Sequence, residues 1–167
     1  MDDPAALDMW EPGFELPRLV RTMTAERMRW YSDALETVSR GSSELILAEP
    51  NIHTDDELAQ ANGLPSRVAD GMVSTNWIHS LLAQVYGLNF LRGGSLRTRY
   101  VRPIFVDERI EVIVRVTGRE TVERGERLVI DVQCVKSDGQ VATAGEAMVR
   151  VPPEVAPARS VPPHNDH

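Results

Sequence analysis

Residues 71–86 read Gly-Met-Val-Ser-Thr-Asn-Trp-Ile-His-Ser-Leu-Leu-Ala-Gln-Val-Tyr, the most apolar helical segment of the sequence. Its apolar side chains cover most of a helical circumference: Met72, Val73, Trp77, Ile78, Leu81, Leu82 and Val85. A helix that is apolar nearly all round is buried in a core. Asp70 is a favoured N-cap residue, and Gly87 is a favoured C-cap residue. We therefore expect a buried central helix over 71–86.

The sequence after Gly94 alternates between apolar and polar residues, as half-buried strands do. This alternation runs through residues 95–102 until Pro103. Further on, two strand faces are apolar, one made of Ile110, Val112, Val114 and Val116, the other of Leu128, Ile130, Val132 and Cys134. Residues 137–140, Ser-Asp-Gly-Gln, have the composition of a hairpin turn leading into 141–151. These patterns predict a long antiparallel meander.

Two further helices are expected before the apolar one. The first has Thr24 as its N-cap and runs from residue 25 to about residue 38. The second begins at Thr54, because Thr54-x-x-Glu57 has the pattern of a capping box. Gly63 and Pro65 end it.

An antiparallel sheet wrapped around one buried helix is the α+β architecture called the hot-dog fold. Two such sheets often join edge to edge, because unpaired edge strands favour further pairing. The length of 167 residues suits a single domain. We expect an N-terminal arm over residues 1–13, a hot-dog domain over 14–151 and a disordered Pro-rich tail over 152–167.

Composition restricts the possible functions. The net charge is −7, and no block of lysine and arginine offers a track for phosphates, which argues against nucleic-acid binding. Cys134 is the single cysteine, so we expect neither an internal disulfide nor a cysteine-based metal site. No apolar run reaches the roughly 18 residues of a membrane span, and the N-terminus lacks the apolar region of a leader. We expect a cytoplasmic protein without metal or cofactor.

The residue types suited to chemistry lie in two nearby segments, Asn51-Ile52-His53-Thr54-Asp55-Asp56-Glu57 and Ala69-Asp70-Gly71-Met72. A histidine changes its charge near neutral pH and can move protons. A helix N-terminus offers free backbone N–H groups to a developing oxyanion. One unit can therefore hold a proton-transfer group beside a helix N-terminus.

These segments resemble the MaoC-like hot-dog family, which includes (R)-specific enoyl-CoA hydratases and 3-hydroxyacyl dehydratases. The family motif is Asp-x-Asn-Pro-x-His-x-Asp, followed later by His-Gly-Met. His53 matches the motif histidine, Asp55 matches the acid two residues beyond it, and Gly71-Met72 matches Gly-Met. The resemblance covers roughly residues 14–151 and includes the family's Pro-x-x-x-Asp pattern at residues 103–107.

The motif is degenerate at three places. Ala48 stands where the family has aspartate, Pro50-Asn51 reverses the Asn-Pro pair, and Asp70 replaces the histidine before Gly-Met. In the family, aspartate and histidine together activate water for addition across an enoyl bond. A backbone N–H at the glycine polarises the thioester carbonyl. Ala48 therefore removes half of the acid/base pair that the resemblance implies.

The resemblance implies His53 as the acid/base and the Gly71 N–H as the oxyanion donor. Asp70 or Glu49 could replace the missing carboxylate. Simpler alternatives remain open, since His53 could be a plain loop histidine and Asp70 only an N-cap. Asp55 is explained by helix capping.

Five residues are candidates for substrate contact: Asn51, Met72, Asn76, Arg97 and Arg99. The amide of Asn51 could donate to a ligand or form an Asx-turn. Asn76 lies among apolar residues and needs a partner if it is buried. Arg97 and Arg99 share one strand face, which is either solvated or a site for the phosphates of coenzyme A or a phosphopantetheine arm.

Three functions fit the sequence. The first is hydration or dehydration at a 2-enoyl or 3-hydroxyacyl thioester of coenzyme A or a carrier protein. The second is the same fold repurposed for isomerisation, cyclisation or elimination on a biosynthetic intermediate. The third is a non-catalytic subunit that completes the tunnel of a competent hot-dog partner, or a ligand-binding module. We expect a homodimer or a hot-dog heterodimer.

Overall fold

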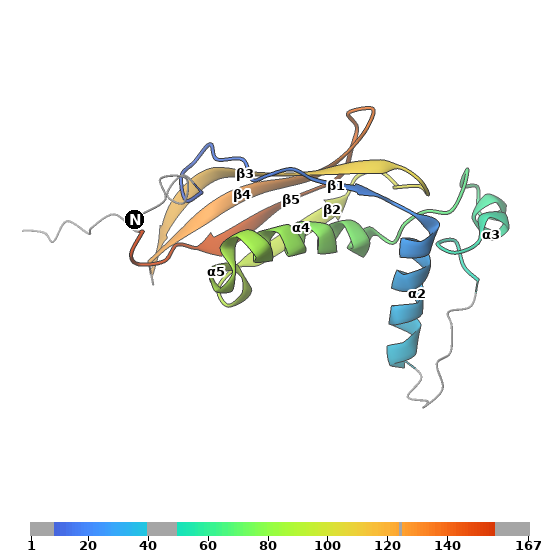
Figure 1. The fold of residues 1–167 in the computed structure, drawn as a ribbon, viewed down its shortest axis with the longest axis horizontal. Helices are drawn as coiled ribbons and strands as arrows, with labels where there is room; N and C mark the ends of the chain where they lie inside the picture. The colour runs from blue at the N-terminus through green and yellow to red at the C-terminus, as the bar shows by residue number, and fades with distance from the viewer. Residues whose placement is uncertain (1–8, 40–49, 124, 156–167) are drawn as a thin grey trace, which may run out of the picture.

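The computed structural model describes residues 9–39, 50–123 and 125–155. Within them, five strands form one antiparallel sheet in the order β1-β3-β4-β5-β2. The strands are β1 Leu19–Thr22, β2 Ser95–Tyr100, β3 Arg109–Val122, β4 Gly125–Lys136 and β5 Val141–Arg150. The helices are α2 Ala25–Ser39, α3 Asp56–Ala61, α4 Gly71–Tyr86 and α5 Leu88–Leu91. Helix α4 runs along one face of the sheet (Figure 1), so the predicted α+β hot-dog architecture is confirmed.

The core forms where strand alternation turns apolar side chains toward α4. The predicted inward residues of β3 and β4 are all fully buried: Ile110, Val112, Val114, Val116, Leu128, Ile130, Val132 and Cys134. Ile78 and Leu82 of α4 are fully buried in the same cluster. Burial raises the pKa of the Cys134 thiol to about 12, which fits its expected role as a small buried apolar residue.

The predicted turn between β4 and β5 is also confirmed. Gly139 has a φ of 82°, a left-handed value that glycine adopts without strain. The Lys136 N–H donates to the Gln140 carbonyl at 2.9 Å, which closes the turn. The pairing of β4 with β5 is irregular between Cys134 and Val135. On the opposite strand, Ala142 and Thr143 are consecutive and both buried, so this irregularity breaks the simple alternation.

Strand β1 is an element that sequence periodicity does not predict. It has only four residues and pairs with β3 at the edge of the sheet, with Leu19 opposite Val112. Residues that precede β1 also pack against α4. The Trp10 ring lies 5.2 Å from the Tyr86 ring, and the Tyr86 hydroxyl donates to the Met9 carbonyl at 3.0 Å. The remainder of the expected arm, residues 1–8, and most of the expected tail, residues 156–167, lie outside the described residues.

The N-termini of two helices test the capping predictions. The Thr24 hydroxyl accepts from the Arg27 N–H at 3.2 Å, as expected at the start of α2. The prediction of Thr54 as the cap of α3 is wrong, because Asp55 caps this helix and its carboxylate accepts from the Leu58 N–H at 2.9 Å. The Thr54 hydroxyl accepts instead from the Asn51 N–H at 3.0 Å, in the turn before the helix.

The predicted bounds and caps of α4 are confirmed, but the expectation that it is buried all round is wrong. Met72 is 45% exposed, and Asn76 and His79 are exposed too. The physical reason is that one sheet covers only one face of the helix, and α2 projects away from the sheet (Figure 1). Trp30 on α2 is 64% exposed as well. None of the helices in the described ranges is both long and apolar enough to cross a membrane.

Two strand glycines allow a matched stability test. A Cβ on Gly145 would lie 2.1 Å from the Arg97 carbonyl oxygen across the β2–β5 pair, whereas a Cβ on Gly118 would lie 3.7 Å from the Val129 Cβ. Gly145→Ala should lower the free energy of unfolding by about 1–3 kcal/mol, because the backbone of β2 must shift. Gly118→Ala should change it by less than about 1 kcal/mol. Urea denaturation measures both, and equal stabilities would contradict the packing described here.

Candidate active site

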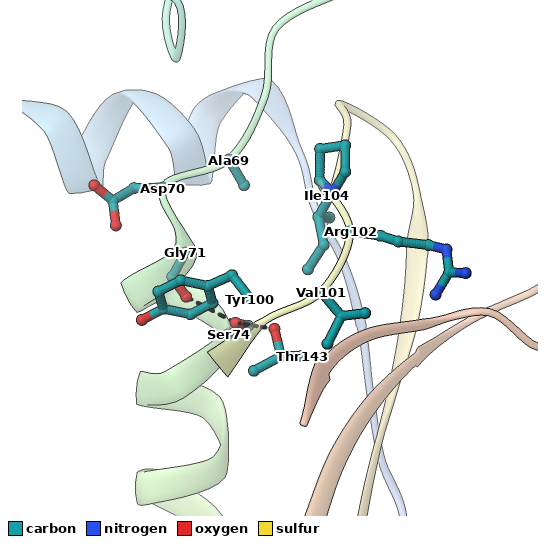
Figure 2. A pocket seen from close by; sticks show the side chains of 10 residues that line it. Ala69, Asp70, Gly71, Ser74, Tyr100, Val101, Arg102, Ile104 and Thr143 are labelled. Carbon is teal, nitrogen blue, oxygen red and sulfur yellow. Dashed lines mark hydrogen bonds between the residues drawn. The ribbon is translucent and has the colours of Figure 1, made fainter. Parts of the chain in front are cut away.

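A pocket of about 230 Å³ opens at the N-terminal end of α4 (Figure 2). Its walls come from the start of α4, the end of β2 with the loop that follows, and β5. The lining residues are Ala69, Asp70, Gly71, Ser74, Tyr100, Val101, Arg102, Pro103, Ile104 and Thr143. The pocket therefore contains Gly71, which the sequence indicates as an oxyanion donor.

Backbone contacts fix the segment that leads into α4. Val68 forms an isolated antiparallel bridge with Phe105, and the Ala69 N–H donates to the Ile104 carbonyl at 2.7 Å. These bonds attach the segment before α4 to the loop after β2. The first turn of α4 is thereby held against the end of β2.

An ion pair between Asp56 and Arg67 closes the loop between α3 and α4. The Arg67 N–H donates to the Asp56 carboxylate at 2.9 Å, and the guanidinium Nε lies 3.1 Å from the same oxygen. The backbone hydrogen bond from Arg67 is the main cause of the lowered pKa of the Asp56 carboxyl. Burial opposes it, and the Arg67 guanidinium adds a smaller lowering effect. Asp56 is therefore used for local structure, as Asp55 is at the N-cap of α3.

His53 is oriented by two hydrogen bonds. Its backbone N–H donates to the Asn51 side-chain oxygen at 2.8 Å, so the Asx-turn alternative for Asn51 is confirmed. Its ring Nδ1 lies 2.6 Å from the Val68 carbonyl oxygen. Because a carbonyl oxygen can only accept, Nδ1 carries the hydrogen. In the neutral imidazole Nε2 is then the unprotonated nitrogen and can act as a base.

Asp70 and Gly71 occupy the start of α4. The Asp70 carboxylate accepts from the Met72 N–H at 2.8 Å, and the Asp70 carbonyl accepts from the Val73 N–H at 3.1 Å. Within the described part of the chain, the Gly71 N–H has no hydrogen-bond partner. Free N–H groups are usual in the first turn of a helix. Asp70 is thus an N-cap, and Gly71 keeps a free donor at the pocket.

The structure does not bring Asp70 and His53 into direct contact. Among the described residues, no hydrogen bond or ion pair joins the two side chains. Glu49, the other candidate carboxylate, lies outside the described residues. In the described ranges, no three residues among His, Cys, Asp and Glu lie close enough to hold a metal ion.

Asn76 and Met72 lie on the exposed side of α4, where α2 approaches. The Asn76 side chain forms a hydrogen bond with the Tyr31 hydroxyl. Burial, followed by the charge of Asp70 and the neighbouring Tyr100, raises the pKa of Tyr31, and the bond to Asn76 opposes this effect. The Tyr31 phenol therefore stays protonated at neutral pH and contributes no charge near Asp70.

Arg97 and Arg99 lie on the opposite face of the sheet from α4. Thr98 between them bonds to Thr75 of α4, with 2.8 Å between the hydroxyl oxygens, and adjacent strand residues point to opposite faces. Arg97 is in register with Glu146 of β5. Within one chain, the two arginines are therefore separated from Gly71 by the sheet.

Two buried hydroxyl groups at the pocket were not expected from the sequence. Ser74 and Thr143 are each about 1% exposed, and their hydroxyl oxygens lie 2.8 Å apart. The Ser74 hydroxyl donates to the Gly71 carbonyl at 2.7 Å, so Thr143 must donate to Ser74. This chain of bonds steadies the first turn of α4. Thr143 could not be predicted, because its inward orientation follows the irregular pairing of β4 with β5.

Tyr100 is the other unexpected residue. Its ring covers Gly71 (Figure 2), and a Cβ on Gly71 would lie 2.7 Å from the ring Cδ2 and Cε2 atoms. The Tyr100 hydroxyl lies 3.0 Å from the Thr75 hydroxyl and 3.1 Å from the Met72 sulfur. Tyr100 is 50% exposed. Tyr100 follows Thr98 by two residues in β2, so strand alternation places both side chains on the same face of the sheet. This spacing is the sequence signal that could have indicated Tyr100 as a pocket residue.

Residues 50–137, more than half of the chain, match the family described as the MaoC-like domain. The chain therefore belongs to the MaoC-like hydratase/dehydratase family. No curated protein sequence matches it.

Solved structures of similar fold include hydratases and a heteromeric complex. The (R)-hydratase from A. caviae involved in PHA biosynthesis is 21% identical, with a TM-score of 0.63 over 85% of this chain and 97% of its own. R-hydratase PhaJ1 from Pseudomonas aeruginosa is 19% identical, with a TM-score of 0.65 over 87% and 84%. A chain of the ChsH1-ChsH2 complex from Mycobacterium tuberculosis is 19% identical, with a TM-score of 0.59 over 84% and 98%. At these identities the likeness shows the shared fold.

The contact between Gly71 and Tyr100 can be tested by a double-mutant cycle. Gly71→Ala should lower the free energy of unfolding by about 1–3 kcal/mol, because the new Cβ meets the ring. In a Tyr100→Ala background the same change should be neutral or stabilising, because alanine favours helix. Urea denaturation of the four proteins gives the coupling energy. Additive effects would show that the ring does not rest on Gly71.

Proposed function

We propose that the chain is a hydro-lyase that adds water to a 2-enoyl thioester or removes it from a 3-hydroxyacyl thioester. The orientation of His53 carries this proposal, because its bond to the Val68 carbonyl leaves Nε2 free as a base. Val68 precedes Gly71 by three residues, a chain length that spans at most about 11 Å. Membership of the MaoC-like family supports the same reaction class.

The proposed reaction needs one proton-transfer group and one oxyanion donor. The thioester oxygen accepts from the Gly71 N–H. His53 Nε2 removes a proton from water as the water oxygen bonds to the β-carbon, and negative charge develops on the thioester oxygen. The imidazolium then returns that proton to the α-carbon, so one water is divided between the two carbons. This order of reaction steps is compatible with alanine at position 48, because the same histidine accepts and returns the proton.

In this proposal Asp70 acts as the N-cap that orients the first turn of α4. Its carboxylate already accepts from the Met72 N–H, and it makes no direct bond to His53 within the described residues. A relayed alternative, in which Asp70 reaches His53 through one water, gives Asp70 a share in the proton transfer. The two roles predict different values of kcat when the negative charge of Asp70 is removed.

We also propose that the chain acts as a dimer on a thioester of coenzyme A or a carrier protein. Met72 and Asn76 then border the substrate on the exposed side of α4. Arg97 and Arg99 can contact the phosphates of that substrate only from a second subunit, because they lie on the sheet face opposite α4.

The first test is His53→Ala with crotonyl-CoA as the substrate. We expect kcat to fall about 10²–10⁴-fold, the usual contribution of a positioned acid/base group. Loss of the enoyl thioester absorbance measures the rate. His79→Ala is a matched control, since His79 lies on α4 with its ring 5.2 Å from Phe90 and should leave kcat unchanged. Wild-type activity in His53→Ala would exclude the proposed acid/base.

A second test separates the two roles of Asp70. Asp70→Asn keeps an oxygen that accepts from the Met72 N–H, so an N-cap role predicts nearly wild-type kcat. Asp70→Ala should cost about 1 kcal/mol of stability, the usual loss of a cap. A fall in the kcat of Asp70→Asn as large as that of His53→Ala would instead support the water-relayed role.

A second candidate function is a non-catalytic subunit of a hot-dog heterodimer. Ala48 and the lack of a carboxylate bonded to His53 in the described residues favour it. It predicts no activity alone and a stable 1:1 complex with a hot-dog protein that carries the full motif. Activity on a cyclic or aromatic intermediate, without activity on simple enoyl thioesters, would favour the repurposed reaction instead.

A further inference from the structure

We propose that the Tyr100 hydroxyl is a second hydrogen-bond donor to the substrate oxygen that Gly71 binds. This inference rests on the proposed function and deepens it, since it adds a residue that touches the reacting group. It is carried by three observations: the shortage of free donors in the first turn of α4, the position of the ring, and the weak acceptor that the hydroxyl now uses.

The first turn of α4 supplies few donors. The Met72 N–H is bonded to the Asp70 carboxylate and the Val73 N–H to the Asp70 carbonyl, which leaves the Gly71 N–H. The negative charge of Asp70 also lies at this turn and opposes negative charge on the substrate oxygen. Removing one donor from an oxyanion site costs about 10²–10³-fold in rate, so a site with one backbone donor gains much from a second.

Tyr100 is placed to supply that donor. It lines the same pocket as Gly71, and its ring rests directly on the Gly71 backbone. In Figure 2 the phenol extends across Gly71 toward the side on which Asp70 lies.

The Tyr100 hydroxyl is not committed to a strong acceptor. The thioether sulfur of Met72 can only accept, so Tyr100 donates to it at 3.1 Å. The Thr75 hydroxyl, at 3.0 Å, then donates to the phenol oxygen. A thioether is a weak acceptor, whereas an enolate oxygen is charged and binds more strongly. Rotation of the O–H toward the substrate therefore exchanges a weak bond for a strong one.

The test is Tyr100→Phe, which removes the hydroxyl and keeps the ring on Gly71. With crotonyl-CoA we expect kcat to fall about 10²–10³-fold, with KM and the melting temperature nearly unchanged. Tyr86→Phe is the matched control, because it makes the same chemical change at the far end of α4. It removes the 3.0 Å bond to the Met9 carbonyl, so it should lower the melting temperature and leave kcat unchanged.

A second measurement needs no turnover. Acetoacetyl-CoA ionises to an enolate that absorbs in the near ultraviolet, and two donors at its oxygen should lower the pKa of the bound ligand. Tyr100→Phe should raise that pKa toward its value in water, whereas Tyr86→Phe should not. A residue that only fills space would leave the ionisation unchanged, so this readout separates donation from packing.

The outcomes separate the two proposals. Wild-type kcat and wild-type ligand ionisation in Tyr100→Phe, beside an inactive His53→Ala, overturn the role of Tyr100 and leave the proposed function standing. A wild-type chain that neither turns over crotonyl-CoA nor binds acetoacetyl-CoA overturns both.

Discussion

The contact between α4 and the inward face of β3 and β4 is the interaction on which the rest of the structure depends. Ile78 and Leu82 are fully buried in one cluster with the alternating apolar residues of both strands. Each buried side chain of this size contributes about 1.5–3 kcal/mol. Because the helix is fixed along one face, its first turn is fixed relative to the end of β2, where the pocket opens.

Main-chain groups hold His53 and the start of α4 in place. The Val68 carbonyl sets the tautomer of His53, and the Gly71 N–H is free because Asp70 accepts from the next amide. Main-chain positions follow from secondary structure, so they tolerate changes in nearby side chains. The family relationship is therefore compatible with Ala48 and with Asp70 in place of the motif histidine.

The sequence predicted those elements whose periodic pattern extends over many residues. The strands β3 and β4 alternate over many residues, so their inward faces were confirmed. The helices α2 and α4 have recognisable caps, so their bounds were confirmed. The four residues of β1 are too few to show a period. Thr54 and Asp55 are both acceptable caps, and the choice between them depended on the turn at Asn51. Short-range chemistry alone does not separate such close alternatives.

By itself, the sequence determined that a histidine precedes one helix, that glycine begins another, and that apolar residues of several strands share one face. These features are local, because they depend on spacing along the chain. Only the tertiary structure decided that Tyr100 lies over Gly71, that Thr143 turns inward, and that Arg97 and Arg99 face away from α4. Each of these depends on strand register or on contacts between distant segments, which local patterns do not encode.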